Sequence, residues 1–166
     1  MDNFERRKKE LLTPLLFEAG AALLDCQSFE YSVCILLFHF SRLGAEGLDP
    51  GRMVAIMEDI DKKTAGQLVK LLKQHLALSE GIDVAFQEAL AARNKLIHRF
   101  LIDNIERFPD QAQRETLTKE IRSLRRQVQK AEKMLRPFIE GLTEALDGVD
   151  LKQFRADAIS KFLEAS

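Results

Sequence analysis

The spacing of apolar side chains constrains this chain most, because they recur every three or four residues along most of its 166 residues. No segment alternates apolar and polar residues for long enough to suggest a strand, so the pattern predicts an all-α fold. The composition is 46% hydrophobic and 31% charged, which is enough to bury a core and stay soluble. The length fits one domain, and we expect a single helical domain over residues 1–166.

The expected helices are bounded by caps, glycines and prolines. They cover residues 4–43, 52–60, 65–79, 84–107 and 112–136, with a short amphipathic tail over 151–163. Pro14 marks either a kink in the first helix or a restart capped by Thr13. Thr64 and Gln67 have the spacing of a capping box, and Asp83 is the expected cap of the fourth helix. Pro137 should bend or end the last long helix.

Two long helices carry heptad-like apolar seams. The seam of the last long helix comprises Leu117, Ile121, Leu124, Val128, Ala131, Leu135 and Phe138. The seam of the first comprises Leu16, Ala19, Leu23, Cys26, Glu30, Val33, Leu37 and Phe40. Glu30 does not fit such a seam, because a carboxylate on a buried line is costly unless it is paired.

A second charge stands out of place on the helix over 84–107. On a helical wheel, Arg93 falls in the middle of the expected buried stripe, where an apolar residue would be usual. Asn94 and His98, four residues apart, are neighbours on the edge of that stripe. We therefore predict a buried ion pair between Glu30 and Arg93, since each misplaced charge would satisfy the other.

One helix thus presents a guanidinium, an amide and an imidazole within two turns. An imidazole moves protons near neutral pH, and a guanidinium grips phosphate and stabilises developing negative charge. This combination suits phosphodiester chemistry. The alternative is that Arg93 is a structural arginine paired with Glu30 and that His98 is an ordinary surface histidine.

Arg93, Asn94 and His98 resemble the signature of HEPN domains (named for higher eukaryotes and prokaryotes nucleotide-binding). That signature is an arginine, often followed by a polar residue, then a histidine five to seven positions after the arginine. Two further segments are similar to bacterial HEPN-like proteins: residues 25–30 on the first helix and the helix start over 63–68. The resemblance covers about residues 15–105.

This resemblance implies an antiparallel bundle of four to six helices that forms a homodimer, with the two motif helices facing each other across a cleft. It implies a metal-independent endoribonuclease or an RNA-binding protein. Arg93, Asn94 and His98 would be the catalytic residues. Glu30 is not part of the resemblance, and we expect it to be a supporting residue through its predicted ion pair with Arg93. An antitoxin is a further expected partner. The competing hypothesis is a non-catalytic helical domain used for dimerisation or interaction.

We expect neither a metal nor another cofactor. His39 and His75 stand singly in separate helices, without a ligand cluster around them. Gly44, Gly47 and Gly51 lack the strand and the lysine of a phosphate-binding loop.

Charge and cysteine usage indicate the surroundings of the chain. The net charge is −1, yet residues 114–136 hold eight lysines or arginines and three glutamates, so this basic helix is either a solvated face or an RNA contact. Cys26 and Cys34 would lie about 12 Å apart along one helix, too far for a disulfide. With no convincing secretory signal and no long apolar run, we expect a cytoplasmic protein without a membrane partner.

Overall fold

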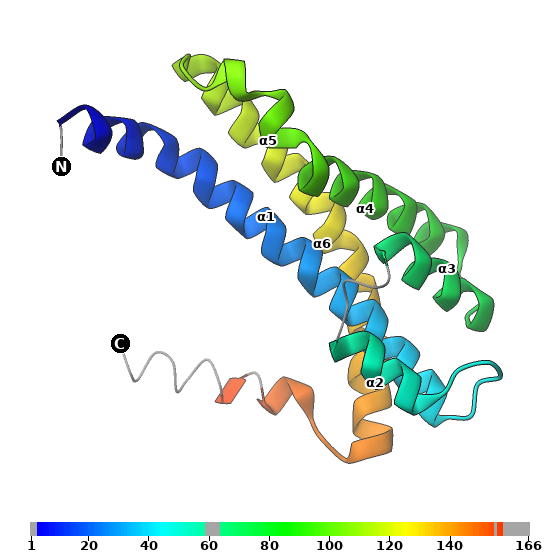
Figure 1. Ribbon diagram of the computed structural model, residues 1–166. Coiled ribbons are helices and arrows are strands. Elements are labelled where there is room, and N and C mark those ends of the chain that lie inside the picture. Colours follow the sequence, from blue (N-terminus) through cyan, green and yellow to red (C-terminus); the bar gives the residue numbers. More distant parts are fainter. Residues whose placement is uncertain (1–2, 59–63, 155, 158–166) are drawn as a thin grey trace. The chain divides into compact units, whose positions relative to one another are not determined.

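The computed structural model describes residues 3–58, 64–154 and 156–157, and the regular elements within these ranges are all helical (Figure 1). They are α1 (Asn3–Arg42), α2 (Pro50–Glu58), α3 (Ala65–His75), α4 (Glu80–His98), α5 (Phe100–Asp103), the 3₁₀ helix η2 (Ile105–Arg107) and α6 (Gln111–Asp147). The predicted all-α class is therefore confirmed.

The chain forms two compact units. Unit 1 combines Met1–Glu30 with Leu78–Glu132, and unit 2 combines Tyr31–Ala77 with Lys133–Ser166. The long helices α1 and α6 contribute residues to both units. The Arg93 motif and its predicted partner Glu30 both belong to unit 1.

Three helices pack side by side in unit 1 (Figure 1). α1 and α6 run parallel in nearly constant register, since Glu18 pairs with Arg122 and Ser28 donates a 3.1 Å hydrogen bond to Glu132. α4 runs antiparallel to α6. Lys130 of α6 contacts Glu88 in the first half of α4, whereas Leu117 and Ile121, nearer the start of α6, pack with Phe100 just after the end of α4. The expected antiparallel packing thus applies to the pairs that include α4, and α1 with α6 departs from it.

The core of unit 1 lies along an unexpected face of α1. Leu15, Ala22, Cys26 and Phe29 are buried, and Phe29 meets Phe86 of α4 edge-on with ring centroids 5.9 Å apart. The predicted seam is wrong at its N-terminal end, because Leu16 and Leu23 remain 51% and 45% exposed. Both sides of α1 are apolar here, so the spacing of apolar residues alone does not select the buried side.

The predicted seam of α6 is largely confirmed. Its buried members are Leu117, Ile121, Val128, Ala131 and Leu135. Leu124 is half-buried, and Phe138 is 45% exposed while the next residue, Ile139, is buried in its place. The change comes directly after Pro137, and α6 continues through that proline rather than ending there.

Several predicted boundaries need correction. α1 is one helix through Pro14, and the hydroxyl of Thr13 bonds to the carbonyl of Lys9 in the turn before, so Thr13 caps no new helix. α4 begins at Glu80 after the N-cap Ser79, which leaves Asp83 inside the helix. α4 ends at His98, nine residues before the predicted end. Arg99 leaves the helical conformation (φ −142°, ψ −19°), and the chain turns to bury Phe100.

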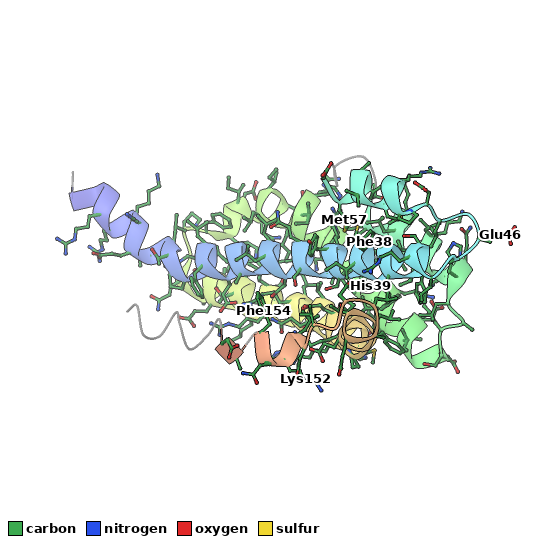
Figure 2. The ribbon with its side chains drawn as sticks, turned by 90° about the horizontal axis from the view of Figure 1, so that it is seen from below. Phe38, His39, Glu46, Met57, Lys152 and Phe154 are labelled. Atoms are coloured by element: carbon green, nitrogen blue, oxygen red, sulfur yellow. The ribbon has the colours of Figure 1, made fainter. Side chains whose placement is uncertain are left out.

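Unit 2 contains α2, α3, the C-terminal part of α1 and the C-terminal part of α6. The predicted capping box of α3 is present, with Thr64 and Gln67 each bonding to the other's backbone N–H. Arg42 of α1 pairs with Asp147 of α6 at 2.8 Å and lies over the Phe38 ring. Figure 2 shows the loop after α1 with Glu46, and the segment after α6 with Lys152 and Phe154; the predicted tail over 151–163 lies mostly outside the described residues.

α1 has one further property of note. By length and composition alone, its Arg6–Arg42 stretch is long and apolar enough to cross a membrane. Core helices of soluble proteins pass the same test, and 44% of the most apolar window is buried inside the protein.

Candidate functional site

Arg93 lies at the edge of the buried face of α4, not in its middle as predicted. The fully buried residues of this helix are Ala85, Phe86, Ala89 and Ala92. Three of these four are alanines, which allow the neighbouring helices to approach closely. Leu90 and Ile97 of the same helix are only half-buried. Arg93 therefore has a buried side that faces α1 and an open side that faces solvent.

The predicted ion pair between Glu30 and Arg93 is present. Arg93 Nε donates to Glu30 Oε1 at 2.6 Å, and the two side chains are only 15% and 10% exposed. A charge-assisted bond of this length fixes the guanidinium in place. Glu30 of α1 thus holds Arg93 of α4 from the buried side.

The same guanidinium connects the other two residues of the motif. Arg93 Nη1 donates to Asn94 Oδ1 at 3.3 Å and lies 3.1 Å from His98 Nε2. An arginine can only donate hydrogen bonds, so His98 Nε2 is the acceptor in this contact. Arg93 Nη2 has no hydrogen-bond partner among the described residues. The cluster thus keeps a donor group, Nη2 of Arg93, for an anionic ligand beside the His98 imidazole.

The helix end explains why His98 can reach this cluster. His98 is the last residue of α4 and is exposed, because the break at Arg99 turns the following chain away. Two more cations flank it. Lys95 lies over the Phe100 ring at 5.7 Å, and Arg99 Nε lies 3.4 Å from Asp103. An exposed imidazole among cations at a helix end is accessible to an anionic polymer.

Cys26 is a neighbour of the cluster that sequence reasoning did not connect with it. Its thiol is buried on α1 near Arg93 and Glu30, and burial raises its pKa to about 11. A thiol with that pKa stays protonated at neutral pH and is a poor nucleophile. Cys26 therefore acts as a core residue behind the motif, and neither Cys26 nor Cys34 forms a disulfide.

An apolar groove of about 350 Å³ lies between α1 and the end of α4. Its walls include Leu16, Gly20 and Leu23 of α1, and Ile97 and Leu101 beside the motif histidine. Three members of the predicted α1 seam that are not fully buried, Leu16, Ala19 and Leu23, thus line this groove. Exposed apolar surface of this kind marks an interaction site more often than chance would suggest.

Unit 1 contains a second polar network that the sequence analysis missed. Glu18, 7% exposed, accepts bonds from Arg122 at 2.7 Å and from Arg125 at 2.6 Å. Arg125 also donates to Asp25 at 2.7 Å, and Gln129 donates to the same carboxylate at 3.0 Å. The bond from Arg122, with help from Arg125, lowers the pKa of Glu18 despite its burial.

This network changes the interpretation of the basic helix. Arg122 and Arg125 are paired with α1, and Lys130 lies 3.4 Å from Glu88 of α4. The two predicted alternatives were a solvated face and an RNA contact. Three of the eight cations of this helix are instead paired with carboxylates of other helices of unit 1.

The remaining histidines belong to unit 2. His39, in unit 2, is buried, bonds through Nε2 to the Thr143 hydroxyl at 2.9 Å, and has a pKa lowered by burial. His75 ends α3 in unit 2. Over residues 3–58, 64–154 and 156–157, no three His, Cys, Asp or Glu side chains are grouped so that they could hold a metal ion.

The chain has no match in comparisons with known proteins. No protein-family model, no curated protein and no solved structure matches it.

Proposed function

We propose that this chain is a HEPN-type protein that acts on RNA as a homodimer, either as a metal-independent endoribonuclease or as an RNA-binding protein. The observation that supports this proposal best is the contact of one guanidinium with Glu30, Asn94 and His98. A purely structural arginine would need only its bond to Glu30. The additional bonds to exposed polar residues are what a phosphate-binding cluster requires.

The geometry suggests how cleavage would proceed. A phosphate oxygen would bind the Nη2 side of Arg93 and compete for Nη1, which releases the lone pair of His98 Nε2. The free imidazole would accept the proton of the adjacent ribose 2′-hydroxyl as that oxygen attacks phosphorus. The 5′-oxygen of the next nucleotide would leave with a proton from a general acid, and a 2′,3′-cyclic phosphate would remain.

A second copy of the chain completes the proposed site. The apolar groove beside Ile97 adjoins the motif, and an exposed apolar surface at this place favours a symmetric contact between two copies. Two motif helices would then face each other, with an Arg93 and a His98 from each copy. A cytoplasmic location and an antitoxin partner belong to this proposal as well.

The groove also favours one alternative function. A helical domain that only dimerises or binds a partner would need the apolar surface but not the polar cluster. Phe17 and Leu24 of α1 are 70% and 66% exposed, which adds to the apolar surface of unit 1. Under this alternative, Arg93 is structural and His98 has no chemical role.

Cleavage of mixed RNA in EDTA separates the two functions. The wild-type protein should cut RNA but not DNA, which lacks the 2′-hydroxyl, and leave cyclic phosphate ends. His98→Ala should lower the rate by about a hundredfold or more, as loss of general acid–base catalysis usually does. His75→Ala, a histidine in unit 2, is the matched control and should leave the rate unchanged. An unchanged rate in His98→Ala would refute the role of this residue, and activity lost with EDTA would point to a metal.

The oligomeric state is a separate prediction. Light scattering should give a dimer, and Ile97→Glu should give a monomer, because the new charge lies in the apolar groove. Leu24→Glu, outside that groove, is the control. A wild-type protein that stays monomeric at high micromolar concentration would rule out a site shared by two copies.

A further inference from the structure

A second cavity in unit 1 has a different character from the groove beside the motif. It has a volume of about 530 Å³ and lies between the start of α1 and the segment that joins α5 to α6. Its apolar walls include Leu11 and Leu12 on one side and Ile105 and Phe108 on the other. Cavities of this size accommodate small organic ligands.

The apolar walls of this cavity are incompletely covered by the protein. Leu11 is 48% exposed and Ile105 is 61% exposed, although they face the same cavity from opposite sides. Phe108 also packs against the core cluster of Leu15 and Leu117, so the cavity adjoins the core of unit 1. An apolar ligand would gain by covering these side chains, since burial of apolar surface is favourable by about 25 cal/mol per Å².

The charge of the lining is entirely positive. The charged residues that line the cavity are Arg7, Lys8 and Arg114, and none of its lining residues is acidic. Arg114 is only 8% exposed, and its Nη1 donates to the carbonyls of Phe108 at 2.6 Å and Pro109 at 2.9 Å. No described carboxylate forms an ion pair with it. A buried cation held by carbonyls alone keeps an uncompensated charge that an anionic ligand would neutralise.

We propose that this cavity binds an aliphatic monocarboxylate, such as a medium-chain or long-chain fatty acid. The chain would lie against Leu11, Leu12, Ile105 and Phe108, and the carboxylate would bind Arg114 with Arg7 at the rim. A nucleotide fits less well, because no neutral polar side chain lines the cavity to hydrogen-bond a base. This site does not depend on the RNA-directed function proposed above.

Titration calorimetry with dodecanoate below its micelle concentration tests the site. The protein should bind one equivalent saturably, and the uncharged methyl ester should bind at least about tenfold more weakly, because it lacks the charge-assisted bonds. Leu11→Glu should weaken dodecanoate binding by at least about tenfold, since it places a like charge beside the ligand. Leu24→Glu is the matched control: it is also an exposed leucine of α1 but lies outside the cavity, and it should bind as the wild type does.

Circular dichroism of both variants should match that of the wild type, because both leucines are exposed. The proposal is overturned if the ester binds as tightly as the acid, or if Leu11→Glu has no effect. It is also overturned if soluble dodecanoate fails to bind. In that case, binding to vesicles of phosphatidylcholine and phosphatidylglycerol that Leu11→Glu abolishes would assign this surface to a membrane instead.

Discussion

Two carboxylates of α1, Glu18 and Glu30, are buried in unit 1, and each holds an arginine from another helix. We call the Glu18 network closed, because the guanidinium of Arg125 has two carboxylate partners, Glu18 and Asp25. The Glu30 cluster is open: Arg93 has one carboxylate partner, and its other contacts are the amide of Asn94 and the imidazole of His98.

This difference separates a structural ion pair from a candidate site. Arg93 and Arg125 are similarly buried, with side chains 15% and 21% exposed, so burial does not distinguish them. What distinguishes them is the chemistry of the partners. Two carboxylates hold the guanidinium of Arg125, whereas the guanidinium of Arg93 has a single carboxylate beside an amide and an imidazole and is the better placed of the two to bind an anion.

The largest effect on stability is expected at the open cluster. Glu30→Ala should lower the free energy of unfolding by about 3 kcal/mol or more, because it leaves Arg93 buried without a counter-charge. Denaturant titration measures this loss. The double variant Glu30→Met with Arg93→Met should recover most of it, since neither charge remains. A loss below about 1 kcal/mol in Glu30→Ala would mean that water already screens the pair.

A smaller effect with a defined pH dependence is expected at the closed network. Glu18→Gln should lower the free energy of unfolding by about 1–2 kcal/mol at pH 7, because Arg125 keeps Asp25 and Arg122 is half-exposed and can turn to water. Since the pKa of Glu18 is lowered below its ordinary value of 4.5, its contribution is complete above that pH and is lost as the pH falls below it.

Stability measured from pH 7 to pH 3 tests this assignment. The wild-type protein should lose stability below about pH 4.5 more steeply than Glu18→Gln, which has no carboxyl group to protonate at this position. Parallel curves for the two proteins would contradict the structural role given to Glu18.

The contrast also explains which features were predictable from sequence. Glu30 and Arg93 each interrupt an apolar pattern. Because a buried charge needs a partner of opposite sign, the sequence alone predicts this ion pair. The apolar spacing does not predict that Glu18 is buried, because the seam that it indicates for α1 runs through Leu16 and Leu23. With Leu15 and Ala22 as the buried residues instead, Glu18 falls on the buried side and requires a partner.

The remaining errors have a similar cause. α4 was predicted to continue to residue 107, because its apolar period persists through Ile97 and Leu101. The helix ends at His98 because a turn at this point buries Phe100. This is an effect of tertiary packing, which the local spacing of apolar residues does not indicate. The hydrogen bond from Arg93 to His98 depends on that helix end, so the sequence predicts the residues of the site and the pair of Glu30 with Arg93, but not the contact of Arg93 with His98.

The central claim is that Arg93, which has a single carboxylate partner, can still bind a phosphate whereas Arg125, held by two carboxylates, does not, and a matched pair of variants tests it most directly. Arg93→Lys and Arg125→Lys both keep the positive charge and remove the guanidinium fork. Their affinities for short random-sequence 2′-O-methyl RNA, which cannot be cleaved by 2′-hydroxyl attack, are compared with that of the wild type at one salt concentration. Arg93→Lys should bind about tenfold more weakly, as expected for the loss of a bidentate phosphate contact, and Arg125→Lys should bind as the wild type does. Equal affinities for the two variants, or a wild-type protein that does not bind RNA, would contradict the claim.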